Sequence, residues 1–494
     1  MTTIQIIGLV VVVLLAALAG FFIIRKSEKH DLLKWVTLFV ILAFALTWIF
    51  SYGYFNGADF SDYGMSRLGL TDIPNIIYYA MNFAGDKIIF LLAIGCFYAI
   101  LSKVEGYKKL VTNLAEKLKG KEILFVLIAS LLFVMMAALF GQTFIGLIFA
   151  PFVISIILSM NLDRLTAFSV TFGSVLIGTL GTVYGGEGLE WFNYYTGLTA
   201  STGIIYRLVV LVVSYILFNL FNVLHVKKTL KEAKVDEKEV DPFRVEKVAK
   251  NAKSWPIIVV FAILFVIMVL GYVGWEKHFE IAIFSKFHTW LMGLKIGEIE
   301  IFKSILGTLA ANASFGTWNL FHMSIILFIV SILVALLGRI KFNDFISAYG
   351  EGAKKMSKSI ILFVLVYMVM IVVYMCPVMP TITNVIFNGV SKFNPFLVSL
   401  MAFIANIFHT DFGFTGYVIG TFFINTYAES VEIIQLIFTT MYGFVQLCVP
   451  TSAILLIGLS YLNIDYKTWI KYIWIFIVAI LVILLVLFTV LTYI

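Results

Sequence analysis

The sequence has little charge. Only 13% of its 494 residues are charged and 62% are hydrophobic, whereas soluble domains are about a quarter charged and about half apolar. The longest polar stretch is residues 225–255, which is too short to form a soluble domain of its own. The composition therefore excludes a chain that folds in water and indicates an integral membrane protein.

Cysteine is also scarce. Cys96, Cys376 and Cys448 lie singly within apolar stretches, with no CxxC motif and no neighbouring histidine cluster. This spacing excludes a disulfide framework and a zinc site, and nothing in the sequence indicates a bound cofactor. The net charge of +7 comes from short basic segments between apolar runs, which set membrane orientation and do not predict nucleic-acid binding.

What the sequence has instead is a series of apolar runs, mostly of about 18 to 25 residues and long enough to span the roughly 30 Å hydrocarbon core. The first run carries Ala17-Leu18-Ala19 but no basic n-region, so we expect an uncleaved spanning helix there. We predict an all-α polytopic membrane protein with about ten transmembrane helices. The predicted spans are 4–24, 32–50, 88–102, 165–183, 204–224, 256–274, 319–338, 359–376, 433–462 and 470–493.

Two further apolar regions, about 123–160 and about 395–426, are too long for one spanning helix. Glycine interrupts each region near its middle, at Gly141 and at Gly413. Glycine tolerates the tight turn that a hairpin inside the membrane requires. We predict that each region is a re-entrant hairpin that enters and leaves on one side. Two full crossings would give the same orientation, so charge does not decide between these alternatives.

Basic residues are distributed unequally between the two sides that these spans define. Of the 35 lysines and arginines, 27 fall in the loops of one side and seven in those of the other, and Arg207 lies at a helix end. The positive-inside rule assigns the first side to the cytoplasm. We therefore predict a multi-pass protein of the plasma membrane with both termini outside. The cytoplasmic loops are 25–34, 103–122, 161–164, 225–255, 339–358 and 463–471.

The charged stretch 225–255 divides the chain near its middle, and we interpret it as a cytoplasmic linker. The segments on either side of it follow the same order of helices with one hairpin, and every direction is reversed. We predict a first transmembrane repeat over 1–224 and a second over 256–494. Inverted repeats of this kind place substrate and ion sites near the bilayer midplane, at hairpin tips and broken helices.

Short sequence matches follow the order that this repeat predicts. Phe-Gly-Gln-Thr at 140–143 marks the first hairpin bend, and Phe-Gly-Phe-Thr at 412–415 marks the second. Thr-Val-Tyr-Gly at 182–185 and Thr-Met-Tyr-Gly at 440–443 come after them. Four-residue matches arise easily in a chain with 47 Phe and 35 Gly, so their shared order carries the argument.

Small and polar residues at these four places are the candidate substrate-binding and ion-binding residues. Hydroxyls can replace missing backbone partners, and the glycines of 169–186 or Pro450 can free carbonyls for a cation. The alternatives are that glycine, serine and threonine only let helices pack closely, or that a kinked helix binds nothing. The candidates are Gly141, Gln142, Thr143, Gly178, Thr179, Gly181, Thr182, Thr410, Asp411, Gly413, Thr415, Gly416, Thr440, Gly443, Gln446, Pro450, Thr451 and Ser452.

Asp411, with His409 beside it, is the strongest single signal among these candidates. An ionisable residue within apolar sequence is costly and is by default a functional candidate. Asp411 could bind a coupling proton, Na⁺ or an amino group. If the hairpin is shallow, both residues would instead lie at the outer interface.

Other ionisable residues carry weaker signals. Asp86 and Lys87 begin a predicted span and suit an interfacial ion pair. Glu187 and Glu190 lie in a predicted outer loop. They would either attract cationic substrates or remain solvated.

The segment 74–122 reads PNIIYYAMNFAGDKIIFLLAIGCFYAILSKVEGYKKLVTNLAEKLKGKE, and 160–174 reads MNLDRLTAFSVTFGS. With the hairpin between them, these segments resemble the YfcC-like carriers, which belong with the C4-dicarboxylate anaerobic carriers and arginine/ornithine antiporters of the ion transporter superfamily. The segment 450–474, PTSAILLIGLSYLNIDYKTWIKYIW, is similar to that family's closing Pro-Thr-Ser helix and its Tyr-x-x-Trp-x-Lys segment. The resemblance covers roughly 74–225 and 339–475.

The resemblance implies paired inverted repeats with two re-entrant hairpins, an elevator-type motion, a possible homodimer, and substrates such as dicarboxylates, amino acids or their conjugates. By position it assigns the hairpin tips to 141–143 and 411–416 and the broken helices to 178–182 and 443–452. Such families often have a Ser-Gly-rich second tip and acidic residues in the first. Here the tips read Phe-Gly-Phe-Thr-Gly and Phe-Gly-Gln-Thr, which leaves substrate and coupling open.

The sequence therefore predicts a secondary active transporter in the lipid bilayer, and no enzyme. Its expected substrate is a small carboxylate-bearing solute, an amino acid or a dicarboxylate, moved by Na⁺ or H⁺ coupling or by exchange, because helix dipoles at hairpin tips favour an anionic group. The alternative is a polytopic membrane enzyme such as a lipid-linked glycosyltransferase, with Asp59 and Asp62 as its only candidate metal-binding acids. A channel would need a repeated polar face, which no predicted span carries.

Overall fold

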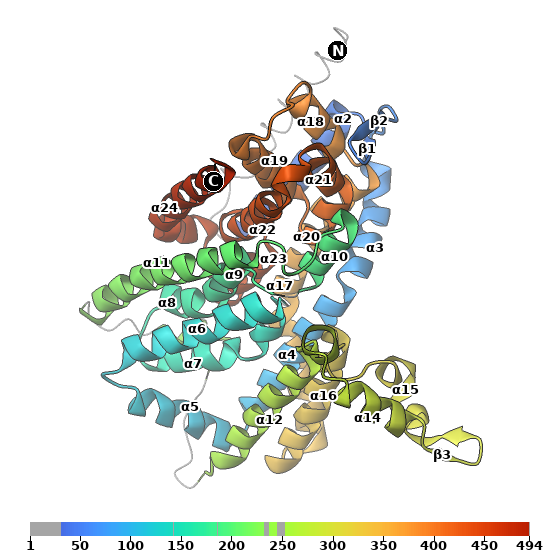
Figure 1. Ribbon diagram of the computed structural model, residues 1–494. Coiled ribbons are helices and arrows are strands. Elements are labelled where there is room, and N and C mark those ends of the chain that lie inside the picture. The colour runs from blue at the N-terminus through green and yellow to red at the C-terminus, as the bar shows by residue number, and fades with distance from the viewer. Residues whose placement is uncertain (1–30, 142, 185, 232–236, 245–251, 494) are drawn as a thin grey trace. The chain divides into compact units, whose positions relative to one another are not determined.

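The computed structural model describes residues 31–141, 143–184, 186–231, 237–244 and 252–493 and is almost wholly helical (Figure 1). Eight of the described helices are long and apolar enough to cross a membrane, or nine if Leu70–Phe83 and Gly85–Leu101 together form one span. The prediction of an all-α polytopic membrane protein is confirmed. The predicted first span, 4–24, lies outside the described residues.

The described chain divides into two compact units, and each unit draws on both halves of the sequence. Unit 1 comprises Met1–Ala84, Leu118–Asp241 and Lys358–Ile494. Its elements are α2 (Asp31–Ile49), β1 (Gly53–Asn56), β2 (Asp59–Asp62), α3 (Ile73–Phe83), α6 (Glu122–Phe140), α7 (Ala150–Ser159), α8 (Arg164–Phe168), α9 (Ser174–Leu180), α10 (Glu187–Thr196), α11 (Ile204–Lys231), α18 (Met379–Phe387), α19 (Pro395–Phe408), α20 (Phe412–Thr415), α21 (Thr421–Thr426), α22 (Val431–Cys448), α23 (Ala453–Tyr461) and α24 (Tyr466–Tyr493).

Unit 2 comprises Gly85–Lys117 and Pro242–Ser357. The helix α17 (Phe342–Met375) begins in this unit and ends in unit 1. The other elements of unit 2 are α4 (Gly85–Leu101), α5 (Glu105–Lys117), α12 (Trp255–Tyr272), α13 (Trp275–Phe279), α14 (Ile283–Met292), β3 (Lys295–Ile296), β4 (Ile299–Glu300), α15 (Ile301–Ala311) and α16 (Leu320–Leu337).

The first interrupted region forms α6 and α7, with a turn between them. The turn begins at Gly141, whose φ of 58° lies in the left-handed region that favours glycine. A short 3-10 turn, Ile145–Ile148, leads into α7, whose second residue is Pro151. The ten residues of α7 rise only about 15 Å, half of the hydrocarbon thickness, so α7 cannot cross the membrane alone.

The second interrupted region bends at a different residue from the one predicted. Helix α19 ends at Phe408, and the chain turns at His409 to Asp411. A helical run then begins at Phe412, so Gly413 lies inside the second arm. The bend precedes Gly413 because the Asp411 carboxylate accepts a hydrogen bond from the Gly413 N–H at 2.8 Å and starts the helix there.

Two of the predicted spans have different limits in the structure. The span predicted at 433–462 consists of α22 and α23, separated by Val449 to Ser452. The span predicted at 359–376 is the last part of the 34-residue helix α17. Its first part passes through a segment predicted as a loop, because charged residues such as Lys354 and Lys355 favour a helix and lie exposed on it.

Some elements carry no signal in the sequence analysis. A two-stranded hairpin pairs β1 with β2 in antiparallel register, with Gly53 opposite Asp62. The short helices α5 and α10 and the segment from α13 to α15 connect longer helices. Periodicity over so few residues is too weak to predict such elements.

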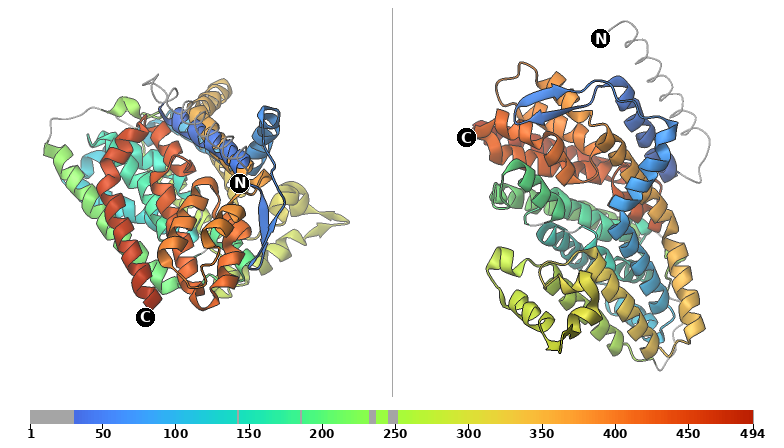
Figure 2. Two further views of the ribbon diagram at one scale, coloured as in Figure 1. Left: turned by 90° about the horizontal axis from the view of Figure 1, so that it is seen from above. Right: turned by 90° about the vertical axis from the view of Figure 1, so that its right-hand side faces the viewer.

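The core of unit 1 forms around α9. Helices α6, α9 and α22 pack side by side, with α11 against α6 and α9 (Figure 1). Figure 2 shows α11 beside α24 when the molecule is viewed from above. This packing brings the parts of the chain before and after the linker into direct contact around the predicted helix breaks.

Candidate functional site

The first hairpin tip lies against the segment that follows α9. Gly141 is half-buried, and a Cβ added to Gly186 would lie 2.7 Å from the Gly141 carbonyl oxygen. This close approach requires glycine at 186, whose φ is 104°. Thr143 is half-buried in the turn, and Gln142 lies outside the described residues.

The helix break after α9 is held mainly by local hydrogen bonds. The Thr182 hydroxyl donates to the Thr179 carbonyl at 2.8 Å, and the Thr179 hydroxyl donates to the Val175 carbonyl at 3.0 Å. The backbone N–H groups of Val183 and Tyr184 both donate to the Ala138 carbonyl of α6. These bonds tie the unwound chain to the first arm of the hairpin.

The glycines of this break serve close helix packing. A Cβ added to Gly178 would lie 2.5 Å from the Val134 carbonyl oxygen of α6. One added to Gly181 would lie 2.5 Å from the Cα atom of Leu211 in α11. Glycine at these two positions allows the close approach of α9 to α6 and α11.

Helix α10 packs on the second hairpin tip. A Cβ added to Gly413 would lie 2.5 Å from the Trp191 Cβ atom, and one added to Gly416 would lie 2.8 Å from the Phe192 Cα atom. The rings of Phe192 and Phe412 are stacked with centroids 4.5 Å apart. The second tip is thus fixed by a helix from the other half of the sequence.

The two predicted tips meet the same short segment. Gly186 contacts Gly141 of the first tip, and a Cβ added to Gly188 would lie 3.2 Å from the Phe412 Cβ atom of the second. The tips are separated by more than half of the sequence. Tertiary packing therefore brings both of them to residues 186–188.

A chain of hydrogen bonds runs inside the second tip. The Thr415 hydroxyl donates to the Asn406 Oδ1 atom at 2.8 Å and lies 3.2 Å from the His409 Nδ1 atom. Because Thr415 donates its hydroxyl hydrogen to Asn406, its oxygen accepts a hydrogen bond from the His409 Nδ1–H group. The Tyr442 hydroxyl of α22 donates to the Thr410 carbonyl at 3.1 Å. These contacts join α19, the tip and α22.

The break between α22 and α23 is ordered by its own polar residues. Pro450 has no N–H group, so the helix cannot continue through it. Ser452 caps α23 by accepting a hydrogen bond from the Leu455 N–H at 3.3 Å. Thr440 donates to the Leu436 carbonyl within α22. The kink predicted at this proline is present.

Gly443 joins the two predicted breaks. A Cβ added to it would lie 2.1 Å from the Leu180 Cα atom and 2.8 Å from the Thr179 carbonyl carbon. No side chain could occupy that space unless the two backbones separated. The end of α9 and the middle of α22 therefore pack backbone against backbone.

Several buried polar atoms near the second tip and the second break have no hydrogen-bond partner in the described part of the chain. Three belong to predicted site residues and two to residues that the candidate list omitted. The omitted Asn406 is an amide among the mostly apolar residues of α19, and this contrast was the signal that could have found it. The atoms are Thr410 Oγ1, Gln446 Nε2, Thr451 Oγ1, Asn406 Nδ2 and His409 Nε2.

The remaining acidic candidates lie elsewhere. Asp59 and Asp62 are exposed on strand β2, and the described residues contain no group of three or more metal-ligating side chains. Asp86 and Lys87 pair at 3.1 Å at the start of α4, with side chains 19% and 14% exposed.

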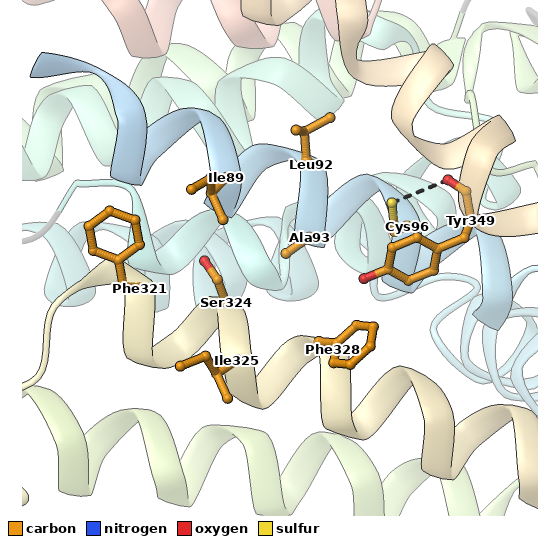
Figure 3. Close-up of a pocket in the computed structure, with 9 residues that line it drawn as sticks. All are labelled: Ile89, Leu92, Ala93, Cys96, Phe321, Ser324, Ile325, Phe328 and Tyr349. Carbon is orange, nitrogen blue, oxygen red and sulfur yellow. Dashed lines mark hydrogen bonds between the residues drawn. The ribbon is translucent and has the colours of Figure 1, made fainter. Parts of the chain in front are cut away.

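Unit 2 has an open, mostly apolar pocket of its own. It has a volume of about 390 Å³ and lies among α4, α16 and the first part of α17 (Figure 3). The Ser324 hydroxyl donates a hydrogen bond to the Leu320 carbonyl, and the Cys96 thiol donates one to the Tyr349 carbonyl. Both of these polar groups therefore already have a hydrogen-bond partner. The other lining residues are Ile89, Leu92, Ala93, Phe321, Ile325 and Phe328. Because the lining is mostly apolar, this pocket does not favour a charged solute.

A comparison with solved structures finds two transporters at low similarity. The YdaH transporter of Alcanivorax borkumensis is 13% identical, with 93% of this chain and 98% of that chain covered and a TM-score of 0.40. MtrF of Neisseria gonorrhoeae, described within a class of antimetabolite efflux pumps, is 12% identical, with 94% and 95% covered and a TM-score of 0.39. No curated protein sequence matches the chain significantly.

The sequence also matches a protein-family model over nearly its whole length. The match runs over residues 6–493, and the family is described as the C4-dicarboxylate anaerobic carrier, DcuC. Both parts of the resemblance seen in the sequence fall within this range. The protein is therefore a membrane transporter and not an enzyme. It belongs to the C4-dicarboxylate anaerobic carrier family.

Proposed function

We propose that this protein is a secondary active transporter of a small carboxylate-bearing solute, a dicarboxylate or an amino acid, in the plasma membrane. The family's description names C4-dicarboxylates, which makes them the first candidates. The transported solute would bind between the second hairpin tip and the break at Pro450. Transport would be coupled to Na⁺ or H⁺ or would proceed by exchange.

One observation carries the proposal. Thr410, Thr451, Asn406 and Gln446 are buried, and each has an unpartnered atom that can donate a hydrogen bond. A buried donor without a partner costs about 1–3 kcal/mol. A carboxylate only accepts hydrogen bonds, through two oxygens, so it suits such a set of donors. The residues 395–426 and 431–462 contain no lysine or arginine, so these neutral donors would do much of the binding.

For mechanism, we expect an elevator-type motion of a hairpin-bearing block. Gly178 and Gly443 bring α6, α9 and α22 into backbone contact, and helices packed this closely move as one body. The inverted repeats predicted from the sequence would supply one hairpin on each side of such a block. A homodimer would provide a fixed scaffold.

Two residues are candidates for proton coupling. Asp411 is half-buried and caps α20. His409 is fully buried, and with its Nδ1 proton directed at Thr415, its neutral ring has Nε2 free as an acceptor. Protonation would turn Nε2 into a charged donor, which would strengthen binding of an anion nearby.

The variants Asp411→Asn and His409→Gln separate these roles. Asparagine keeps an oxygen that can cap α20, so Asp411→Asn removes charge with little structural change. If Asp411 couples transport, the variant should lose uphill uptake driven by a proton or Na⁺ gradient while still exchanging solute. If transport and its dependence on pH and Na⁺ are unchanged in Asp411→Asn, Asp411 is not the coupling residue, and His409 becomes the better candidate for proton coupling.

The function itself is tested in proteoliposomes. The purified protein is reconstituted, and uptake of succinate, fumarate, aspartate and arginine is measured with a proton gradient, with a Na⁺ gradient, and after preloading with unlabelled solute. We expect gradient-driven or exchange flux for at least one carboxylate. Absence of both kinds of flux across the panel would overturn the proposal.

A further inference from the structure

Arg207 stands apart from the other basic residues. Among the lysines and arginines that the structure describes, it is the only one that is buried, with an exposed fraction of 0%. It lies in the first turn of α11, a helix of spanning length. A buried cation within a membrane segment is costly and normally has a specific partner.

The guanidinium group of Arg207 has only part of the partners it can use. Its Nη2 atom donates to the carbonyls of Ala200 and Thr202 in the loop before α11. Its Nε and Nη1 atoms have no partner. No described carboxylate lies within ion-pair distance of it. Nε and Nη2 lie on one edge of the guanidinium plane and can donate in parallel, which matches the two oxygens of one carboxylate. Nη2 is available for such a pair only when it leaves the loop carbonyls.

Other polar groups gather at the same loop. The Gln435 Nε2 atom of α22 donates to the Asn193 Oδ1 atom of α10 and to the Thr199 carbonyl. The Gln435 Oε1 atom is buried and has no partner. The loop carbonyls at 199, 200 and 202 are thus held by side chains of two different helices.

Arg207 is also close to the break after α9. Leu211 follows it by one helical turn on the same face of α11, and a Cβ added to Gly181 would lie 2.5 Å from the Leu211 Cα atom. One turn rises about 5.4 Å. The guanidinium group therefore lies within about one helical turn of the contact between α9 and α11, and near the end of α22 that carries Gln435.

A purely structural role is the alternative. Arg207 would then only fasten the loop to α11 through Nη2. Fastening two carbonyls needs only one or two donors, which a neutral amide supplies without burying a charge. The structural role therefore leaves the charge and the two unpartnered N–H groups unexplained.

We infer that Arg207 is the cationic anchor for a carboxylate group of the transported anion, bound through Nε and Nη2 when the loop 197–203 opens and releases Nη2. The inference rests on the proposed function and adds to it the one buried positive charge of the described chain. In the conformation described, the loop carbonyls cover the group.

The test compares Arg207→Gln and Arg207→Lys with the control Arg164→Gln. Arg164 lies partly exposed and faces Glu237 at 3.6 Å, far from the loop 197–203 in sequence. Uptake of succinate, its monoamide, aspartate and arginine is measured in proteoliposomes. For a carboxylate that the parent protein transports, we expect Arg207→Gln to raise KM at least tenfold, Arg207→Lys to raise it less, and Arg164→Gln to leave it unchanged.

Thermal stabilisation of the detergent-solubilised protein by the same solutes gives a second readout. Arg207→Gln should lose this stabilisation, and its preference for succinate over the monoamide should fall. If KM and stabilisation in Arg207→Gln equal those of the parent protein, the inference is wrong and Arg207 only fastens the loop.

The outcomes separate the two proposals. If the parent protein moves none of the carboxylates, the proposed function fails and the inference fails with it. If the parent protein transports and Arg207→Gln does not fold, Arg207→Lys decides, because it keeps the charge but loses the planar fork. A parental KM in a folded Arg207→Lys variant would overturn the inference.

Discussion

At the scale of single residues, the glycines of the candidate site have two different functions. Gly141 and Gly186 have positive φ angles and shape the chain. Gly178, Gly413 and Gly443 lie in helices, where the missing side chain lets another backbone or helix approach. From the density of glycines along the sequence, each of them would be expected only to weaken a helix. Their backbone angles and packing partners in the structure show which glycines shape a turn and which allow close packing.

Gly443→Ala tests the packing role. The new Cβ atom would overlap the Leu180 backbone at 2.1 Å, and a backbone atom cannot rotate away as a side chain can. We expect a loss of stability of about 1–3 kcal/mol, seen as a lower melting temperature in detergent. Gly69→Ala is the control, because no heavy atom lies within 4 Å of its added Cβ. Equal melting temperatures for the two variants would contradict this account.

At the scale of elements, the two interrupted regions achieve a bend by different means. The first ends α6 on a left-handed glycine, and the second starts α20 on an aspartate cap. A third junction, between α7 and α8, also uses an aspartate cap. Asp163 accepts hydrogen bonds from the N–H and hydroxyl of Thr166 and lies 2.8 Å from the His225 Nε2 atom of α11.

This junction should depend on pH. Burial raises the pKa of Asp163, but the bonds from His225 and Thr166 outweigh burial, and the net pKa falls below its ordinary value of 3.8. A carboxyl group with a lower pKa in the folded state stabilises the fold above the ordinary value. That stabilisation is lost as the pH falls through the pKa of the folded state.

Asp163→Asn tests the junction, because asparagine keeps a capping oxygen but has no charge. At pH 7 the variant should be less stable than the parent protein by about 1–2 kcal/mol. The difference should begin to shrink as the pH falls below about 4, where the unfolded chain takes up a proton, and should be lost once the pH is below the lowered pKa of the folded carboxyl group. The measurement is thermal unfolding in detergent from pH 3 to 8. A difference that stays constant over this range would show that the charge has no role.

At the scale of the whole molecule, the charge distribution predicts which loops face the cytoplasm. Within unit 2 the ends of α4 and α16 meet, since a Cβ added to Gly338 would lie 2.9 Å from the Val104 Cγ2 atom. The predicted cytoplasmic loops 103–122 and 339–358 begin at these two helix ends. Their proximity agrees with the prediction that both loops lie on one side.

Single cysteines test the predicted orientation. Lys341→Cys lies in a predicted cytoplasmic loop and Glu298→Cys in a predicted outer loop, and both positions are exposed. A membrane-impermeant maleimide added to intact cells should label Glu298→Cys alone and should reach Lys341→Cys only after permeabilisation. The parent protein reports any background from its own cysteines, of which Cys96 and Cys376 are buried. The reverse labelling pattern would show that the orientation in the membrane is opposite to the one predicted.

The sequence by itself determined that the protein lies in a lipid bilayer, that its fold is all-α, and where most of its spanning helices are. Hydrophobic run length and basic-residue position are local properties, and the bilayer acts on them directly. Pro450 and Gly141 could be located as a helix break and a turn for the same reason, since each restricts or frees its own backbone. The resemblance to carriers, visible at 74–122 and 450–474, likewise anticipated the family.

Only the tertiary structure decided which of the marked residues come together. The contact of Gly443 with Leu180, and that of both hairpin tips with residues 186–188, join residues far apart in the sequence. No local pattern encodes such contacts, because they depend on how whole helices pack. For the same reason the sequence analysis set Arg207 aside as a residue at a helix end. Its burial and its unpartnered donors became apparent only once the surrounding helices were in place.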